Sequence, residues 1–421
     1  MAVTTTSVAE QCAAAKRAAH ELAMLDSSTK NRALQEIAQA LIERTPEIVG
    51  ANSLDLEAAR DAGLSAALLD RLALDEGRVA TIAAQVRDIA ALPDPVGEVI
   101  DGGRLPNGLD VRRVRVPLGV IAVVYEARPN VTIDASALCL KSGNAIVLRG
   151  SSTAAHSNAA LAAVASEAAT RAGMPENALT LVAGGGHEEL EQLAIQTGVV
   201  DLIIPRGGEG LKAALKGVAT VPVIYAASGN CHVYVDATAD LDAARAIAFN
   251  AKTQRPSVCN AAETLLVHEA VAADFLPAAL RELAGAGVEL RGDDRVQSLA
   301  GEIAVAPATE EDWATEYLSL TLAVAVVDSV EEAIEHINRF GSGHSEAIVT
   351  RDTESARAFQ LAVDAACVYV NASTRFTDGG EFGMGAEIGN STQKLHARGP
   401  IGLRELCTFK YLIEGAGHVR P

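Results

Sequence analysis

The stretch Lys252-Thr-Gln-Arg-Pro-Ser-Val-Cys-Asn-Ala-Ala-Glu-Thr264 leads from a predicted helix into a predicted strand, and this alternation decides the fold of the chain. Pro256 and its polar neighbours indicate an irregular loop, because proline has no backbone N–H for a helix or sheet to use. The apolar run in 263–267 is typical of a buried strand. Cys259 is therefore expected on a turn beside a rigid element.

Two interpretations of Cys259 follow from this loop. A thiol placed there can be exposed, and its thiolate could be stabilised by Arg255 or by the backbone amides of a helix N-terminus. Alternatively, Cys259 is a buried structural cysteine, as most free cysteines are. The loop by itself leaves both open.

Helix and strand patterns alternate from Asp236 onward, so the Cys259 loop opens a predicted doubly wound α/β unit. The expected strands are 263–267, 322–327, 345–349 and 367–370, and the expected helices are 241–252, 270–286, 330–338 and 353–365. The long polar and glycine-rich stretch 371–404 has little regular pattern. A loop of this length in a compact chain is a candidate substrate loop.

The same alternation precedes Asp236 and predicts a first parallel sheet covered on both faces. The expected strands are 120–125, 145–148, 180–183, 201–204 and 222–225, with helices near 133–141, 154–172, 187–197 and 208–216. Ligands bind such sheets beyond the carboxyl ends of the strands. Residues 126–130, 149–153, 184–186 and 206–210 should line that rim. Their glycines permit close approach of a phosphate but are equally consistent with ordinary turns, and none forms a GxGxxG fingerprint.

Two further regions flank these units. Residues 7–92 show the apolar spacing of amphipathic helices and carry no catalytic constellation. Residues 98–116 alternate around Asn107-Gly108, which is the strongest short signal for a β-hairpin; the alternative is a solvated loop between domains. Strand character returns at 406–414. An isolated hairpin is marginal, so this region should pack on something else, such as a partner subunit.

Composition restricts the class of protein. With 421 residues, 49% of them hydrophobic, the chain is expected to form more than one domain. A formal net charge of −19 disfavours nucleic acid as a partner. The six cysteines are scattered without CxxC spacing, which argues against a disulfide framework and predicts no metal site. No apolar run is long enough for a membrane helix, so a soluble protein is expected, and the cysteine pattern indicates a reduced, cytoplasmic location.

Seven motifs resemble those of the gamma-glutamyl phosphate reductase branch of the aldehyde dehydrogenase superfamily. They are Pro117-Leu-Gly-Val-Ile121, Glu126-Ala-Arg-Pro-Asn-Val-Thr132, Leu148-Arg-Gly-Ser-Ser152, Asp201-Leu-Ile-Ile-Pro-Arg-Gly-Gly208, Gln254-Arg-Pro-Ser-Val-Cys-Asn260, Gly341-Ser-Gly-His-Ser-Glu346 and Ala397-Arg-Gly-Pro-Ile-Gly402. The resemblance runs essentially from end to end. It implies an α/β, aldehyde dehydrogenase-like fold with two doubly wound parallel-sheet domains and a small β oligomerisation element.

The resemblance also implies the division of the chain. Residues 1–100 and 117–235 would form the dinucleotide-binding domain, 236–402 the catalytic domain, and 101–116 with 403–421 the oligomerisation element. A homo-oligomer, dimer or tetramer, is implied, with glutamate 5-kinase as a partner enzyme.

The resemblance assigns Cys259 as the nucleophile and Asn130 as the oxyanion-hole amide; from the residues alone, Asn130 could instead cap a helix. The cofactor-binding residues it implies are Arg149, Ser151, Ser152, Arg206, Gly207, Gly208 and Glu316. Where NAD-preferring relatives have a glutamate, this chain has Ser152, which favours NADPH because a carboxylate would repel a 2′-phosphate. Arg128, Arg375 and Lys394 are candidate contacts for an anionic substrate, although each could equally be solvated or ion-paired.

The implied reaction is the NADPH-dependent reduction of gamma-glutamyl phosphate to glutamate-5-semialdehyde and phosphate, a step of proline biosynthesis, through a cysteine thioester. The alternative is an aldehyde-oxidising or CoA-acylating dehydrogenase on the same fold. The stretch Tyr225–His232, where hydrolytic relatives carry a glutamate, contains no carboxylate. The implied thioester would therefore lack a general base for its hydrolysis.

Overall fold

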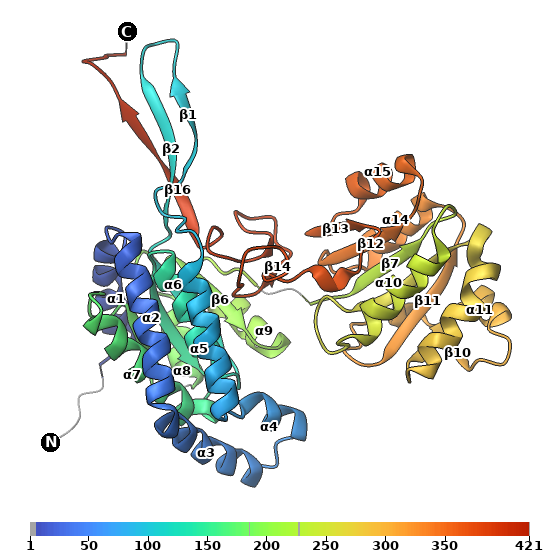
Figure 1. The fold of residues 1–421 in the computed structure, drawn as a ribbon, viewed down its shortest axis with the longest axis horizontal. Helices are drawn as coiled ribbons and strands as arrows, with labels where there is room; N and C mark the ends of the chain where they lie inside the picture. Colours follow the sequence, from blue (N-terminus) through green and yellow to red (C-terminus); the bar gives the residue numbers. More distant parts are fainter. Residues whose placement is uncertain (1–5, 185, 226–227, 421) are drawn as a thin grey trace. The chain divides into compact units, whose positions relative to one another are not determined.

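The computed structural model describes residues 6–184, 186–225 and 228–420. The chain forms two compact units. Unit 1 comprises residues 1–225, 383–389 and 401–421, and unit 2 comprises 226–382 and 390–400. Figure 1 shows the course of the chain through both units.

Unit 1 opens with helices, as predicted for residues 7–92. They are α1 (Val8–Leu22), α2 (Ser27–Glu43), α3 (Thr45–Asp61), α4 (Ala66–Leu72) and α5 (Glu76–Ala91). Side chains of Ser7, Asp26 and Asp75 accept backbone N–H bonds at the starts of α1, α2 and α5. Such caps satisfy donors that the first helical turn leaves without partners.

The first parallel sheet runs in the order β5-β4-β3-β6. Its strands are β3 (Val120–Tyr125), β4 (Ala145–Gly150), β5 (Leu179–Leu181) and β6 (Leu202–Arg206); α6 (Asn130–Lys141), η1 (Ser152–Ala154), α7 (Ala155–Arg171), α8 (His187–Ala194) and α9 (Glu209–Val218) connect or follow them. Tyr125 pairs with Gly150 on one side and with Arg206 on the other. The carboxyl ends of these strands therefore meet at one edge.

The strand predicted at 222–225 was wrong. Val223 forms an isolated bridge with Ile203 rather than part of a strand. Ile203 donates its N–H to the Pro222 carbonyl and accepts the N–H of Ile224, and the pairing with β6 ends there. Pro222 has no N–H with which to extend it.

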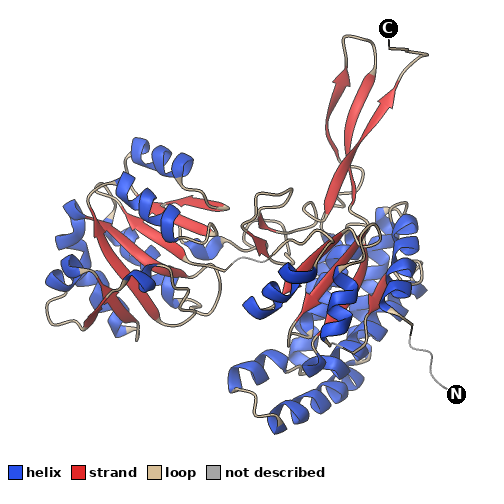
Figure 2. Ribbon diagram, turned by 180° about the vertical axis from the view of Figure 1, so that it is seen from behind, coloured by secondary structure: helices blue, strands red, loops and turns tan. Residues whose placement is uncertain are grey.

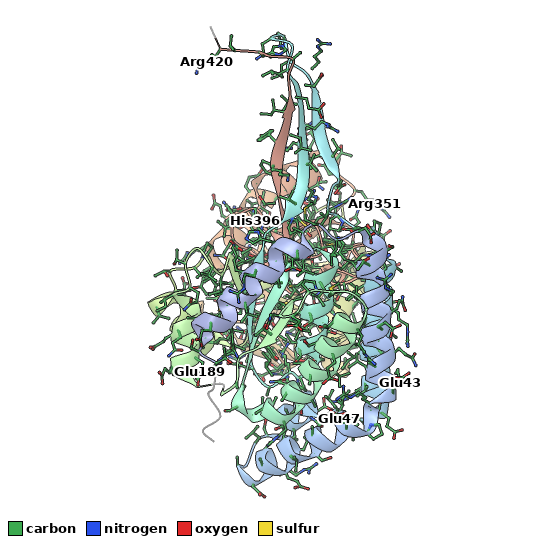
Figure 3. The ribbon with its side chains drawn as sticks, turned by 90° about the vertical axis from the view of Figure 1, so that its left-hand side faces the viewer. Glu43, Glu47, Glu189, Arg351, His396 and Arg420 are labelled. Carbon is green, nitrogen blue, oxygen red and sulfur yellow. The ribbon has the colours of Figure 1, made fainter. Side chains whose placement is uncertain are left out.

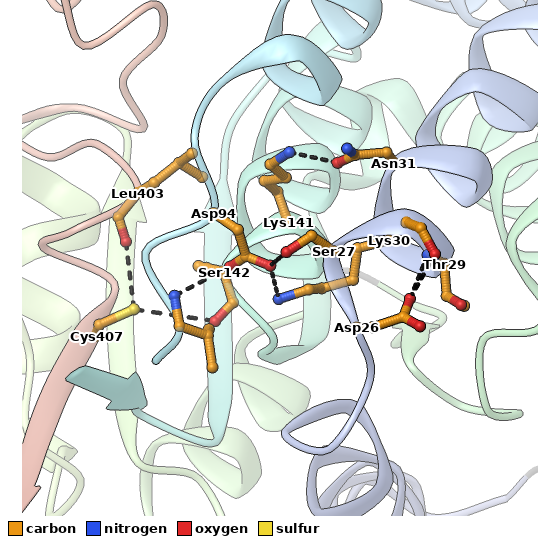
Figure 4. Close-up of polar contacts among 12 residues, drawn as sticks. Asp26, Ser27, Thr29, Lys30, Asn31, Asp94, Lys141, Ser142, Leu403 and Cys407 are labelled. Carbon is orange, nitrogen blue, oxygen red and sulfur yellow. Dashed lines mark hydrogen bonds and ion pairs between the residues drawn. The ribbon is translucent and has the colours of Figure 1, made fainter. Parts of the chain in front are cut away.

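Buried polar contacts join α2, the segment before β1 and α6 (Figure 4). Lys30 is buried and forms an ion pair with Asp94, whose carboxylate also accepts a 2.7 Å bond from Ser27. Lys141 is buried as well and donates to the carbonyl of Ala90 at 2.8 Å. These bonds compensate charges that burial alone would make costly.

The predicted hairpin is confirmed as β1 (Val99–Arg104) and β2 (Asp110–Pro117), and β16 (Cys407–Glu414) pairs antiparallel with β2. We call β1, β2 and β16 the arm. Gly108 in its turn has φ +90°, a conformation that glycine adopts without strain. Arg420 lies at the tip of the arm (Figure 3). Phe409, Tyr411 and Ile413 are exposed on β16.

The sheet of unit 2 runs in the order β10-β9-β11-β8-β7-β12-β13, with parallel pairing throughout. Its strands are β7 (Cys231–Val235), β8 (Ala262–His268), β9 (Glu289–Gly292), β10 (Val305–Pro307), β11 (Thr321–Val327), β12 (Ser345–Val349) and β13 (Cys367–Val370). Its helices are α10 (Leu241–Thr253), α11 (Glu269–Gly285), α12 (Asp294–Leu299), α13 (Glu310–Trp313), α14 (Val330–Phe340) and α15 (Thr353–Ala362).

Alternate residues of β7 enter different cores of unit 2. Val233 and Val235 pack in one core with residues of α10 and α11, whereas Tyr234 packs in the other with residues of α14 and α15. Helices thus cover both faces of the sheet (Figure 2), and the predicted doubly wound architecture is confirmed. The sequence interpretation missed β7, β9 and β10. β7 is only five residues long and directly follows the small and polar residues Ser228, Gly229 and Asn230, which concealed a central strand.

The Cys259 loop precedes β8 and so lies at the amino ends of the strands of unit 2. Residues 371–404 are mostly irregular, as predicted, and contain only η2 (Thr374–Phe376), β14 (Asn390–Ser391) and β15 (Gly399–Pro400). Within the described ranges, no helix is both long and apolar enough to cross a membrane. Those same residues include no group of three or more His, Cys, Asp or Glu side chains that could hold a metal ion.

Candidate active site

Cys259 differs from the other cysteines in its exposure. All six cysteines lie within the described ranges; Cys259 is half-buried and the other five are buried. Burial raises the pKa of Cys12 to about 11 and raises the pKa of Cys231 well above its ordinary value. Because a thiolate must be both formed and reached by its substrate, Cys259 is the thiol best placed to act as a nucleophile.

The backbone of Cys259 is held from the β7 side of the loop. The Cys231 thiol donates to the carbonyl oxygen of Cys259 across 3.2 Å. A Cβ at Gly229 would come within 1.5 Å of the same oxygen, so this position accepts only glycine. Gly229 in turn donates its N–H to Glu316 at 2.6 Å. The sequence interpretation missed both Gly229 and Cys231 as supports of the loop.

The 371–404 loop contacts the Cys259 loop directly. Arg375 donates to Gln254 at 2.8 Å and to the side-chain oxygen of Asn260, while Thr374 donates to the Asn260 carbonyl at 2.7 Å. Burial lowers the pKa of Arg375, as does the charge of Arg255, whereas Cys259 opposes this shift. Arg375 therefore lies within electrostatic reach of Cys259 and can stabilise its thiolate.

A buried ion pair closes the base of the loop. Lys252 at the end of α10 lies 2.5 Å from Glu263 in β8, and Leu318 donates its N–H to Glu263 at 3.2 Å. Burial raises the pKa of Glu263 to about 7 and lowers the pKa of Lys252, against their mutual attraction. Leu318 belongs to the same segment as Glu316, so the ion pair ties that segment to the Cys259 loop.

In unit 1, Arg149 lies at the carboxyl end of β4, where it is largely buried and donates to the Gly186 carbonyl. Burial lowers the pKa of Arg149, and nearby Glu189 opposes this shift. Ser151 caps η1 and accepts the N–H of Thr153 at 3.1 Å, whereas Ser152 is exposed. Gly184 and Gly186 follow the neighbouring strand β5, and Gly185 lies outside the described residues.

Arg206, Gly207 and Gly208 connect the end of β6 to α9, as predicted. Gly208 donates its N–H to Glu126 at 3.0 Å, and a Cβ at Gly207 would lie 2.7 Å from the Glu126 carboxyl carbon. An acidic side chain thus occupies the N-terminus of α9, where the helix dipole favours an anion. The sequence interpretation did not identify Glu126 in this role.

Asn130 is the first residue of α6, and Pro129 rather than Asn130 occupies the N-cap position. The Asn130 side chain donates to Asp134 at 2.9 Å. Burial raises the pKa of Asp134 to about 6, although the bond from Asn130 and the charge of Arg206 oppose the rise. Asn130 is thereby fixed at the same edge of the sheet as Arg206. Arg128 is exposed on the turn before α6.

Lys394 is exposed in unit 2 and pairs with Asp364 at 2.5 Å. The structure therefore brings Arg149, Ser151, Ser152, Arg206, Gly207 and Gly208 to one edge of the unit 1 sheet, and Cys259, Arg375 and Glu316 together in unit 2. Lys394 is not part of the contact network around Cys259 described above.

Comparison with known proteins agrees with this architecture. The model of the aldehyde dehydrogenase family matches residues 1–298 and 305–410. The gamma-glutamyl phosphate reductase of Thermobifida fusca is 57% identical over 96% of this chain and 97% of its own length, and that of Moorella thermoacetica is 58% identical with the same coverage. The crystal structure of gamma-glutamyl phosphate reductase from Thermotoga maritima superimposes with a TM-score of 0.96 at 47% identity, covering 99% of this chain and 100% of that one.

The chain therefore belongs to the aldehyde dehydrogenase family. This class comprises oxidoreductases that use a nicotinamide cofactor on a small-molecule substrate. Within it, the chain is a member of the gamma-glutamyl phosphate reductases, as the sequence motifs had indicated.

Proposed function

We propose that the protein reduces gamma-glutamyl phosphate to glutamate-5-semialdehyde and phosphate, with NADPH as the cofactor and a thioester on Cys259 as the intermediate. The reaction is a step of proline biosynthesis. The observation that carries this proposal is the half-buried Cys259 thiol, the only one of the six cysteines that is not buried, on a loop whose Gln254 and Asn260 accept bonds from Arg375.

Cys259 would attack the acyl carbon of the substrate as a thiolate. A carbon–sulfur bond forms, the carbon–oxygen bond to phosphate breaks, and phosphate leaves with its electron pair. When bound, the cofactor would supply a hydride to the thioester carbon. Breaking of the carbon–sulfur bond would then release the aldehyde and return the Cys259 thiolate. Cysteine suits this route because its thiolate is strongly nucleophilic near neutral pH.

The Asn130 amide and the backbone N–H of Cys259 are the proposed donors to the oxygen that develops negative charge. Losing one such donor typically costs about 10²–10³ in rate. The bond from Asn130 to Asp134 supports this role, because it fixes the amide before a substrate arrives. Glu316 is the proposed contact for the nicotinamide ribose, and its bond to Gly229 holds it beside the Cys259 loop.

The edge of the unit 1 sheet fits an anionic dinucleotide. Arg149, Ser151 and Ser152 would hold the adenosine ribose with its 2′-phosphate, and Arg206, Gly207 and Gly208 would meet the diphosphate. Ser152 is exposed and can donate a hydrogen bond, whereas a glutamate there would repel the 2′-phosphate. The Glu126 carboxylate already bonded to Gly208 marks this helix end as a place for an anion.

Arg128, Arg375 and Lys394 remain the candidate contacts for the substrate's anionic groups. Arg375 has the strongest support of these, since it contacts the Cys259 loop.

We further propose that the arm joins subunits of a homo-oligomer, that glutamate 5-kinase is a partner, and that the enzyme works in the cytoplasm. Residues 1–100 and 117–235 would bind the dinucleotide, 236–402 would form the catalytic domain, and 101–116 with 403–421 would form the oligomerisation element.

Steady-state kinetics in the oxidative direction test the proposal. With glutamate-5-semialdehyde and phosphate, NADP⁺ should be reduced with a higher kcat/KM than NAD⁺. Replacing Ser152 with glutamate should lower kcat/KM for NADP⁺ at least tenfold and leave that for NAD⁺ nearly unchanged, because only the phosphorylated ribose is repelled. An equal loss with both cofactors would contradict the assignment of Ser152, and absence of turnover with either cofactor would contradict the proposed reaction.

A further inference from the structure

Unit 2 contains a pocket of about 250 Å³ whose lining includes Lys394, one of the candidate substrate contacts. One wall is the Gly341–Glu346 motif, which follows α14 and enters β12. The other wall comes from the irregular 371–404 loop. The lining includes Gly341, Ser342 and Glu346 from the first segment and Thr392, Lys394 and Arg398 from the second.

Glu346 brings a buried carboxylate to this pocket. Its Oε2 accepts the backbone N–H of His232 at 2.7 Å and lies 2.9 Å from Nδ1 of the same residue. Its Oε1 has no hydrogen-bond partner among the residues that the structure describes. Burial raises the pKa of Glu346, and His232 opposes that rise. A buried carboxylate oxygen without a donor is costly, which points to a missing cationic or donor group.

The backbone at Gly341 packs closely beside this oxygen. A Cβ at position 341 would lie 3.0 Å from Glu346 Oε1 and 2.5 Å from the Ile337 carbonyl oxygen. A side chain at this position would clash with the Ile337 carbonyl, so glycine is required where the backbone passes the carboxylate.

The opposite wall supplies cations. Lys394 and Arg398 both pair with Asp364, at 2.5 and 2.8 Å, so Asp364 is already compensated. Each cation has further N–H groups, and Nε of Arg398 has no partner within the described part of the chain. The pocket thus presents an anionic acceptor on one side and cationic donors on the other.

We propose that this pocket binds the head group of an α-amino acid, with the ammonium at Glu346 Oε1 and the carboxylate at Arg398 and Lys394. A simple anion would leave the Glu346 carboxylate without compensation, and a simple cation would leave the donors of Arg398 unused. The volume equals that of about eight liquid water molecules at about 30 Å³ each, which accommodates an amino acid of modest size.

The pocket is connected to the Cys259 loop by a short path. Ser342 in the pocket wall accepts the N–H of Asn230 at 3.0 Å. The preceding residue, Gly229, packs on the Cys259 carbonyl and bonds to Glu316. An occupant that shifts the Gly341–Gly343 loop would therefore act on the residues that hold Cys259.

Titration calorimetry with L-glutamate tests the proposal. N-acetyl-L-glutamate, which lacks the ammonium, is the matched ligand control. Glu346→Gln and Arg398→Gln should each weaken L-glutamate binding about tenfold or more, because each removes one charged partner. Glu335→Gln, on the exposed side of α14, should leave the affinity unchanged. Arg398 is part-exposed, so its variant keeps the test valid if Glu346→Gln fails to fold.

Unchanged affinity in both pocket variants, or equal binding of the acetylated ligand, would overturn the proposal. The binding assay needs no turnover, so it fails or succeeds independently of the proposed reaction. Kinetics with glutamate-5-semialdehyde then identify the source of the head group. If Glu346→Gln raises KM without lowering kcat, the head group belongs to the substrate, and this assignment rests on the proposed function. If L-glutamate changes kcat of the wild type but not of Glu346→Gln, the ligand is a separate amino acid.

Discussion

Lys252 Nζ lies 2.5 Å from Glu263 Oε2, and both side chains are fully buried at the two ends of the Cys259 loop. The Lys252 ammonium also lies 5.9 Å from the centre of the Tyr317 ring. One ion pair therefore joins α10, β8 and the segment that carries Glu316. Removing either partner would leave an uncompensated charge beneath the candidate nucleophile.

We predict that Lys252→Met and Glu263→Gln each lower the free energy of unfolding by about 3–5 kcal/mol, the usual cost of breaking a buried pair. The double variant Lys252→Met/Glu263→Leu should be much less destabilised than the sum of the single effects, because no charge remains buried. Urea unfolding measures all three. The exposed pair Arg351–Asp240 is the control, and its removal should cost at most about 1 kcal/mol. Additive single effects would show that the two residues do not interact.

The same pair predicts how stability depends on pH. The pKa of Glu263 is raised to about 7 in the folded chain from an ordinary value of 4.5. The folded state then holds this proton more tightly than the unfolded state. Proton binding by Glu263 therefore contributes fully to the stability of the fold below about pH 4.5, and this contribution is lost as the pH rises through 7.

The Lys252 charge lowers the pKa of Glu263, so Lys252→Met should raise that pKa further. The loss of stability with rising pH should then continue to a higher pH in the variant than in the wild type. Urea unfolding of wild type and variant between pH 5 and about pH 8 measures the difference. If the free energy of unfolding of the two proteins changed with pH in the same way, Lys252 would not control the pKa of Glu263.

Cys259→Ala should abolish hydride transfer while folding and NADPH binding stay near normal, since the thioester requires this sulfur. Turnover, thermal unfolding and cofactor fluorescence measure the three properties. Cys12→Ala, in a buried position of α1, is the control and should retain activity. If Cys259→Ala kept more than roughly 1% of wild-type turnover, Cys259 could not be the nucleophile.

Oxidation of glutamate-5-semialdehyde should depend on phosphate. The stretch Tyr225–His232 contains no carboxylate to activate water, and a missing general base typically slows such a step by about 10²–10⁴. NADP⁺ reduction measured with and without phosphate tests this, with acyl phosphate as the expected product. Steady turnover without phosphate, with glutamate accumulating, would indicate a hydrolytic aldehyde dehydrogenase instead.

Deleting residues 406–421 should yield monomers or aggregates, because β2 would lose its partner β16 and expose a sheet edge. Tyr411→Glu and Ile413→Glu offer milder tests, since both side chains are exposed on β16 and neither change removes a strand. Light scattering measures the particle mass. A mass unchanged in the deletion and in both substitutions would refute a role of the arm in joining subunits.

Much of the fold could be predicted from local patterns. The hairpin at Asn107-Gly108, the opening helices and most parallel strands are encoded by residues adjacent in sequence, and the structure confirms them. The strand β7 was missed and 222–225 was wrongly assigned, because short apolar runs beside glycine or proline do not show by themselves whether a neighbouring strand can pair with them.

The sequence by itself indicated the fold class, through the alternation of helix and strand patterns along the chain, and Cys259 as the candidate nucleophile, through motifs that resemble those of the family. Only the tertiary structure decided which charges meet. Glu263 joins Lys252, Glu126 occupies the start of α9 at Gly208, and Glu346 turns toward His232 and a pocket. These partners lie 11, 82 and 114 positions apart. Burial makes such pairings energetically decisive, and burial exists only once the sheets and helices have packed.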